Sequence, residues 1–144
     1  MNTDVSIMLV EDDYMDVRNV ERELKKINVD IPLYTARNGR EALAMLRGEG
    51  VPQINPLPSV VMLDINMPRM NGIEFLTEIR KDPFLKNLNV FIMTTSTEDS
   101  DRFAAQKLDV SGYIEKPLTF DKFGGTDGST IDSFSLFLDL LKLK

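Results

Sequence analysis

The sequence has 144 residues, 42% of them hydrophobic and 28% charged, with a formal net charge of −6 and neither Cys nor His. The length and composition fit one soluble domain. The absence of Cys and His excludes disulfides, thiolate or imidazole metal sites, Ser-His-Asp catalysis and a phosphohistidine on this chain. The acidic net charge disfavours nucleic acid as a partner. No apolar run approaches the ~18–20 residues that span a bilayer, and no basic region precedes the first apolar run as in a signal peptide, so we expect a cytoplasmic protein without a membrane partner.

The first half of the chain alternates between strand and helix patterns. Val5–Val10 (VSIMLV) is a short apolar run with β-branched residues, which predicts a buried strand. Apolar residues at helical spacing predict a helix over Tyr14–Asn28, and a weaker strand follows at Leu33–Ala36. A short helix is predicted at Gly39–Arg47, and the three prolines and two glycines of 48–58 predict a loop.

The second half continues the alternation. Val60–Asp64 and Asn89–Thr94 predict two more strands, and the helix Gly72–Lys81 lies between them. A further helix is predicted at Glu98–Leu108 and a fifth strand at Gly112–Glu115. Strands that alternate with helices indicate an α/β fold, and near-continuous apolar strands are typical of a parallel sheet buried on both faces. We therefore expect a doubly wound, five-stranded parallel sheet.

Polar side chains follow these strands at their carboxyl ends. Glu11–Asp13 follow the first strand, Asp64 ends the third, Thr94 ends the fourth, and Lys116 comes directly after the fifth. In open α/β sheets, functional sites form outside the carboxyl ends of the strands. If the first, third, fourth and fifth strands are neighbours, several carboxylates, a hydroxyl and an ammonium meet at one site.

Such a site has the components for phosphoryl chemistry. Clustered carboxylates repel one another, and a divalent cation such as Mg²⁺, which prefers oxygen ligands, relieves that repulsion. Lys116 offers a compact positive charge for a phosphoryl oxygen, and Thr94 offers a hydroxyl for the same group. One carboxylate can attack phosphorus and form an acyl phosphate. The Lys116–Pro117 bond is a candidate cis-proline bond that would turn Lys116 toward the cluster, and the sequence leaves both isomers open.

Each of these residues also has a purely structural interpretation. Glu11–Asp13 could cap the following helix and complement its dipole. Asp64 could cap the turn after its strand, residues 94–97 could form a simple polar turn, and Tyr113 could be a half-buried edge residue. The occurrence of acids, a hydroxyl and Lys at the ends of sister strands favours a common site.

Four segments in order, MLVEDD, VVMLDINMPRMNG, FIMTTS and GYIEKP, resemble the receiver domain of two-component response regulators. The resemblance covers roughly Val5 to Phe123, and each segment stands at the end of a predicted strand. It implies a flavodoxin-like (β/α)5 receiver fold. We expect residues 1–144 to form a single receiver domain.

The resemblance also implies a metal site and a phosphorylation site. Asp64 resembles the phospho-acceptor. Glu11 and Asp12 resemble the acidic pair that binds Mg²⁺, with Asp12 the direct ligand, and Asn66 would add its backbone carbonyl. Asp13 stands at a variable position, and a shift of one residue within this acidic run is open.

Further residues resemble those that hold and release the phosphoryl group. Thr94 and Lys116 would bind the phosphoryl oxygens. Tyr113 matches the switch aromatic, whose ring is expected to turn inward as Thr94 moves. Asn66 and Ser96, each two residues after a central site residue, should tune the rate of dephosphorylation.

The segments VEDDYMDVR and KDPFLKNLNV, the long loop Gly48–Pro58 and the TTS after the fourth strand are further similar to single-domain regulators that are paired with bacterial and cyanobacterial phytochromes. The resemblance implies a phosphorylation switch, not an enzyme with a substrate of its own, whose donor is a histidine kinase such as a bacteriophytochrome. With twenty-seven residues after Pro117, we expect output through a downstream protein or a phosphotransfer protein. Two alternatives are a haloacid-dehalogenase-like phosphatase, which usually has an acid where Asn66 stands, and a pseudo-receiver that never accepts phosphate.

The C-terminal segment departs from the family pattern. Residues 122–130 (KFGGTDGST) contain three glycines where the last helix normally begins, so residues 124–144 form an atypical glycine-rich connection followed by a helix candidate at Phe134–Lys144. One apolar stripe of that helix can dock on the sheet, and a second favours self-association. A strand remains an alternative for this segment. We expect a homodimer or partner surface that includes Phe134, Leu136, Phe137, Leu140 and Leu143.

Overall fold

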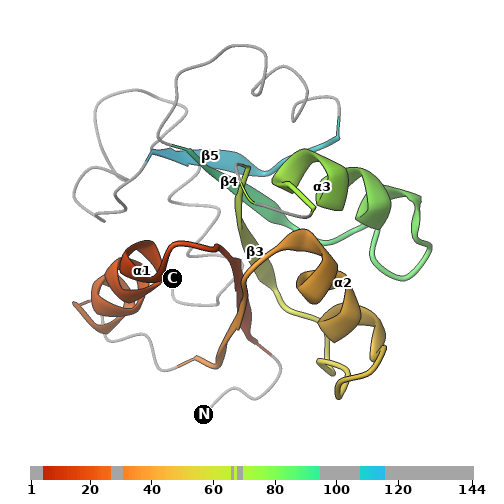
Figure 1. Ribbon diagram of the computed structural model, residues 1–144, viewed down its shortest axis with the longest axis horizontal. Helices are drawn as coiled ribbons and strands as arrows, with labels where there is room; N and C mark the ends of the chain where they lie inside the picture. The colour runs from red at the N-terminus through yellow and green to blue at the C-terminus, as the bar shows by residue number, and fades with distance from the viewer. Residues whose placement is uncertain (1–4, 27–30, 66, 68–69, 95–107, 116–144) are drawn as a thin grey trace.

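The computed structural model describes residues 5–26, 31–65, 67, 70–94 and 108–115. Strands and helices alternate along these ranges (Figure 1). Their bounds are β1 Ile7–Val10, α1 Tyr14–Lys26, β2 Leu33–Ala36, α2 Gly39–Arg47, β3 Val60–Asp64, α3 Gly72–Lys81, β4 Val90–Thr94 and β5 Gly112–Glu115. None of the described helices is both long and apolar enough to cross a bilayer.

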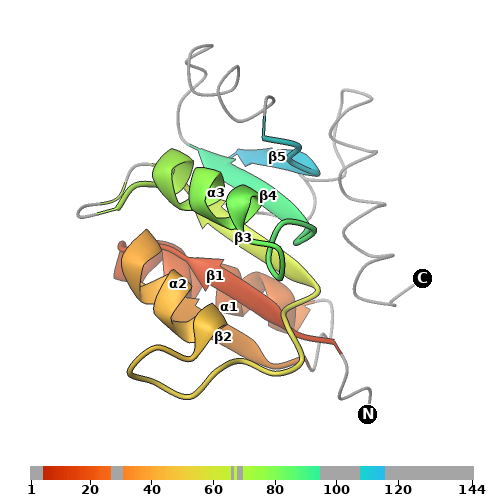
Figure 2. The same cartoon turned by 90° about the vertical axis from the view of Figure 1, so that its right-hand side faces the viewer.

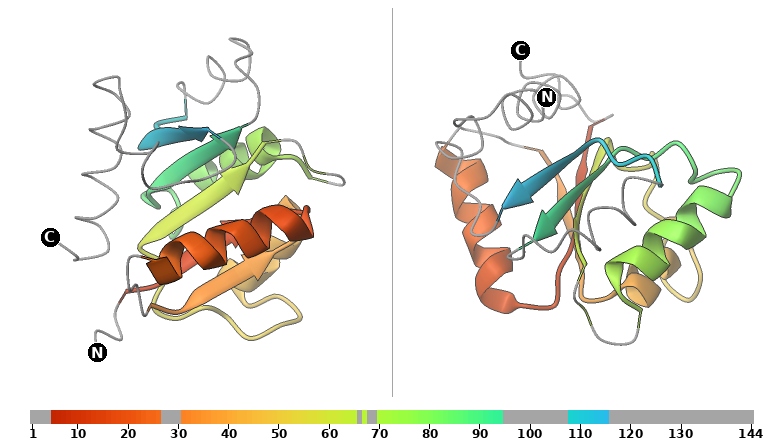
Figure 3. Two further views of the ribbon diagram at one scale, coloured as in Figure 1. Left: turned by 90° about the vertical axis from the view of Figure 1, so that its left-hand side faces the viewer. Right: turned by 90° about the horizontal axis from the view of Figure 1, so that it is seen from above.

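The strands form one parallel sheet in the order β2-β1-β3-β4-β5. This is the flavodoxin-like order, in which the chain first moves to one side of β1 and then returns to the other. Helix α1 covers one face of the sheet, and α2 and α3 cover the opposite face, so the sheet is doubly wound as predicted (Figure 3, right).

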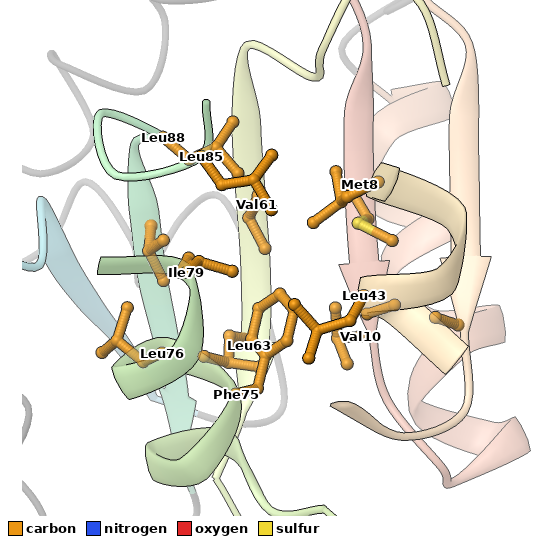
Figure 4. Packing of buried hydrophobic residues seen from close by; sticks show 14 of the residues in the cluster. Met8, Val10, Leu43, Val61, Leu63, Phe75, Leu76, Ile79, Leu85 and Leu88 are labelled. Carbon is orange, nitrogen blue, oxygen red and sulfur yellow. The ribbon is translucent and has the colours of Figure 1, made fainter. Parts of the chain in front are cut away.

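The core has two halves because successive residues of a strand point to opposite faces. In β3, Val61 and Leu63 belong to the apolar cluster under α2 and α3, while Val60 and Met62 belong to the cluster under α1. All four are fully buried. Figure 4 shows Leu63 against Phe75 of α3, with Val10 and Leu43 close by. Burial on both faces explains why β1 and β3 have no alternation of polar and apolar residues.

Helices α2 and α3 lie side by side and begin with the same four-residue pattern, Asn-Gly-x-Glu (Figure 2). Asn38 caps α2 by accepting a hydrogen bond from the Glu41 N–H, and Asn71 caps α3 in the same way through Glu74. In α3 the Glu74 side chain also accepts the Asn71 N–H, which completes a capping box. The pattern fixes where both helices start.

The predicted elements agree with the structure except at a few ends. Strand β1 begins at Ile7 rather than Val5, and β4 begins at Val90 rather than Asn89, because ladder pairing with β3 starts at those later residues. Of the helix predicted to end at Leu108, only that residue is described, and it lies in a turn with Asp109. The remainder of that helix, the end of α1 after Lys26 and the C-terminal segment lie outside the described residues.

Candidate functional site

Three carboxylates meet at the carboxyl ends of β1 and β3. Val10 is the register partner of Leu63, so the residues that follow, Glu11 and Asp64, leave the two strands beside each other. One carboxylate oxygen each of Glu11, Asp12 and Asp64 lies within 4.8 Å of the other two. The structure therefore brings together three of the four acids that were predicted at these two strand ends.

The acids of Glu11–Asp13 have two different roles, helix capping and a place in the carboxylate cluster. Asp13 accepts a hydrogen bond from the Met15 N–H at 2.8 Å, and its carbonyl accepts the Val17 N–H at 3.1 Å, so it caps α1. Glu11 instead turns toward Asp64, and its Oε2 accepts the Asp13 N–H at 3.1 Å. The capping interpretation thus holds for Asp13, while Glu11 and Asp12 belong to the carboxylate cluster.

The cluster has the donor chemistry of a hard-cation site. Glu11 is 2% exposed and Asp64 5%, whereas Asp12 is open to solvent. Mg²⁺ holds its ligand oxygens at ~2.0–2.1 Å, so two ligands on opposite sides of it lie about 4.2 Å apart. Oxygens within 4.8 Å of one another can therefore share one such ion after a small adjustment or through a water. The exposed Asp12 leaves the cluster accessible from solvent.

The backbone after Asp64 is held by Gly72, the first residue of α3. The Gly72 N–H donates to the Ile65 carbonyl at 2.8 Å. A Cβ on Gly72 would lie 2.5 Å from the Asp64 carbonyl oxygen and 2.7 Å from Ile65 Cα, which is closer than real Cβ contacts allow. The start of α3 thus packs directly on the strand end that bears Asp64, and the Asn-Gly pair was the signal for it.

The other predicted site residues are described in part. Thr94 ends β4 one position after Met93, the register partner of Asp64, so its backbone lies at the same edge of the sheet. Tyr113 of β5 is half-buried and packs against the core cluster beneath α2 and α3. The remaining predicted positions lie outside the described residues: Asn66, Ser96, Lys116, Pro117, and Phe134, Leu136, Phe137, Leu140 and Leu143. The structure has a cis bond at Asn55–Pro56, and the isomer of Lys116–Pro117 stays a prediction.

The chain matches proteins of one signalling family. Residues 7–124 match the family model of the response regulator receiver domain. Response regulator Rcp1 of Synechocystis sp. is 38% identical over 110 residues, which are 76% of this chain and 75% of that protein. A structure of the Mn²⁺-bound form of response regulator Rcp1 has 30% identity and a TM-score of 0.70, covering 97% of this chain and 96% of that one.

Two other solved structures are similar. A two-component response regulator from Legionella pneumophila is 36% identical with a TM-score of 0.76, covering 94% of this chain and 98% of that one. The phosphorylated cyanobacterial phytochrome response regulator RcpA is 31% identical with a TM-score of 0.74, covering 96% and 94%. With the sheet order and the acidic cluster already described, these matches place the chain in the response regulator receiver domain family.

Proposed function

We propose that this protein is a phospho-accepting response regulator whose residues 1–144 act as a single receiver domain. Asp64 would receive a phosphoryl group from a phosphohistidine of a partner histidine kinase, in the presence of Mg²⁺. The observation that supports this most directly is the convergence of Glu11, Asp12 and Asp64 within 4.8 Å at neighbouring strand ends. In a receiver domain, this constellation would supply both a nucleophile and a cation site.

In the proposed transfer, an Asp64 carboxylate oxygen attacks phosphorus as the phosphorus–nitrogen bond to the donor imidazole breaks. A phosphorus–oxygen bond forms, and the imidazole leaves with the electron pair and takes up a proton. Glu11, Asp12 and the Asn66 carbonyl would hold the cation beside Asp64. Bound Mg²⁺ supplies positive charge that stabilises the phosphoryl oxygens during transfer. Asp64 is suited to this step because Gly72 and the buried β3 fix its backbone.

The phosphoryl group would then shift an equilibrium between two conformations. Thr94 and Lys116 would bind its oxygens, and Tyr113 would change its packing on β5 as Thr94 moves. The half-buried position of Tyr113 supports this role, since such a ring has both a core contact and a solvent-facing edge. Hydrolysis of the acyl phosphate resets the switch, at a rate that Asn66 and Ser96 would tune.

The names of the relatives support a particular kind of donor. RcpA is a phosphorylated phytochrome response regulator, and a bacteriophytochrome response regulator, AtBRR, has a TM-score of 0.75 to this chain at 27% identity. We propose that the donor here is likewise a phytochrome-type histidine kinase in the cytoplasm. Output would pass by contact with a downstream protein or by relay to a phosphotransfer protein.

The proposal is tested by incubation with acetyl phosphate and Mg²⁺, followed by intact-mass measurement. Wild type should gain one phosphoryl group per chain, and Asp64→Asn should gain none. Asp109→Asn is the matched control. Asp109 is an exposed acid in the turn before β5, so it lies at the amino ends of the strands and away from Asp64. Asn tolerates its positive φ of 57°. This control should label like wild type.

Other outcomes would contradict the proposal. No adduct on wild type, under conditions that label a known receiver, would indicate a pseudo-receiver. Continuous release of phosphate from small phosphate esters, lost in Asp64→Asn, would indicate a phosphatase. The donor is tested separately by the rate of phosphoryl transfer from an autophosphorylated phytochrome kinase and from an unrelated histidine kinase. Equal rates from both would contradict the phytochrome assignment.

A further inference from the structure

Gly39 joins the start of α2 to the loop between β3 and α3. It is the first residue of α2 and is buried. Its N–H donates to the carbonyl oxygen of Met70 at 3.0 Å. Met70 precedes the Asn71 cap of α3, so this hydrogen bond connects two segments that are 31 positions apart (70 minus 39). Met70 packs against the apolar cluster beneath α2 and α3, so the link lies on that side of the sheet.

The contact leaves no room for a side chain at position 39. A Cβ there would lie 2.8 Å from Met70 Cγ, 2.8 Å from Phe75 Cβ and 3.0 Å from the Met70 carbonyl oxygen. Met70 Cγ can turn aside, but Phe75 Cβ and the Met70 carbonyl move only with their backbone. Gly39 does not have a positive φ, so a larger residue is excluded here by space and not by conformation.

The strain of a larger residue would pass to Asp64 through one turn of helix. Phe75 lies in the first turn of α3, which begins at Gly72. Gly72 packs against the Asp64 carbonyl and donates to the Ile65 carbonyl. The first turn of α3 is therefore held between Gly39 on one side and the end of β3 on the other. A shift at Gly39 displaces that turn relative to Asp64.

We infer that Gly39 is a positioning residue for the phospho-acceptor, acting through Met70 and Phe75. The inference rests on the proposed function, because it concerns the geometry in which Asp64 meets Glu11 and Asp12. Receipt of a phosphoryl group requires the nucleophile at a defined place, and a displacement of about 1 Å lowers such rates by up to ~100-fold.

The test compares Gly39→Ala with Gly48→Ala. Both substitutions strain α2, but Gly48 is the C-cap at the end of the helix that is far from Met70. Alanine is strained there because φ is +72° and the added Cβ would lie 2.9 Å from Gln53 Cβ. The labelling rate with acetyl phosphate and Mg²⁺ is measured well below both melting transitions. Gly39→Ala should label about tenfold more slowly than wild type, while Gly48→Ala should label at the wild-type rate despite its lower melting temperature.

A second readout separates this inference from the proposed function. The amide chemical shift of Ile65, followed through a Mg²⁺ titration, reports the end of β3 without phosphate. It should move in Gly39→Ala before any Mg²⁺ is added and stay unchanged in Gly48→Ala. If wild type never labels, the proposed function fails. The Ile65 chemical shift then still shows whether Gly39 positions the end of β3.

Several results would overturn the positioning role. These are a folded Gly39→Ala that labels at the wild-type rate, an unchanged Ile65 shift, or equal slowing in both variants, which would indicate a general loss of α2 stability. If Gly39→Ala does not fold, Met70→Ala replaces it, because it removes the side-chain contact through which the start of α2 packs on the residue before the α3 cap, and so loosens the first turn of α3 while the Gly39–Met70 hydrogen bond remains. It should slow labelling in the same direction, and an unchanged rate would count against the inference.

Discussion

Among single residues, Asp12 and Asp13 are adjacent acids with different surroundings. Asp12 lies in the carboxylate cluster, and Asp13 caps α1. We expect Asp12→Asn to raise the Mg²⁺ concentration needed for half-maximal labelling by at least about tenfold, since it removes a proposed ligand. Asp13→Asn should leave both this concentration and stability unchanged because Asn caps helices as well as Asp does.

A companion variant, Asp13→Ala, distinguishes the two tasks further. Loss of the cap should lower the free energy of unfolding by about 1 kcal/mol, measured by urea denaturation, without a change in Mg²⁺ dependence. If Asp13→Asn raised the Mg²⁺ concentration for half-maximal labelling as much as Asp12→Asn does, the acidic pair would be Asp12 and Asp13 rather than Glu11 and Asp12.

Among elements, α2 and α3 each have an arginine in the last turn, Arg47 and Arg80, at the same distance from the Asn cap, yet the two side chains have different partners. Arg80 donates to four backbone carbonyls at 2.7–3.0 Å, those of Lys86, Leu88, Leu108 and Asp109. Burial lowers the pKa of its guanidinium, against the opposing effect of Asp109, but an arginine remains charged at neutral pH. Arg47 makes an ion pair with Asp82 at 3.1 Å.

This difference predicts unequal losses of stability. Arg80→Ala should lower the free energy of unfolding by about 2–3 kcal/mol, because it removes the common partner of carbonyls that join the end of α3 to the turn before β5. Arg47→Ala, the matched control, should lower it by less than about 1 kcal/mol, as is usual for a partly exposed ion pair. Urea denaturation of both variants measures the difference, and equal losses would contradict this account of Arg80.

The sequence predicts local features of these elements well and distant contacts poorly. Apolar runs and helical spacing identify β3 and α3 to the residue, because both are local patterns in the sequence. The acids at the ends of β1 and β3 meet because these strands are neighbours, which was assumed from the sequence and is confirmed by the strand order. The contacts of Gly39 with Met70, and of Arg80 with Leu108, join positions that are 31 and 28 apart. Nothing near either residue in the sequence specifies its partner, and only the packed structure identifies it.

For the whole molecule, the segment Phe134–Lys144 is the predicted interaction surface. Its structure lies outside the described residues, and its sequence predicts a helix with three faces. One apolar stripe contains Phe134 and Phe137, a second contains Leu136, Leu140 and Leu143, and the third face is polar. A domain needs one apolar stripe to dock the helix, so the second stripe would be exposed on a monomer.

We therefore predict that Leu136→Glu with Leu140→Glu converts a homodimer to a monomer, measured by size-exclusion chromatography with light scattering. The charges lie on the second stripe alone, so the domain should remain folded and should still label on Asp64. Ser135→Glu is the matched control, because it adds a charge to the polar face of the same segment, next in helical spacing to Asp139. It should leave the dimer intact. A wild type that is monomeric with and without acetyl phosphate would rule out the dimer. A double variant that elutes unchanged would place any dimer interface elsewhere.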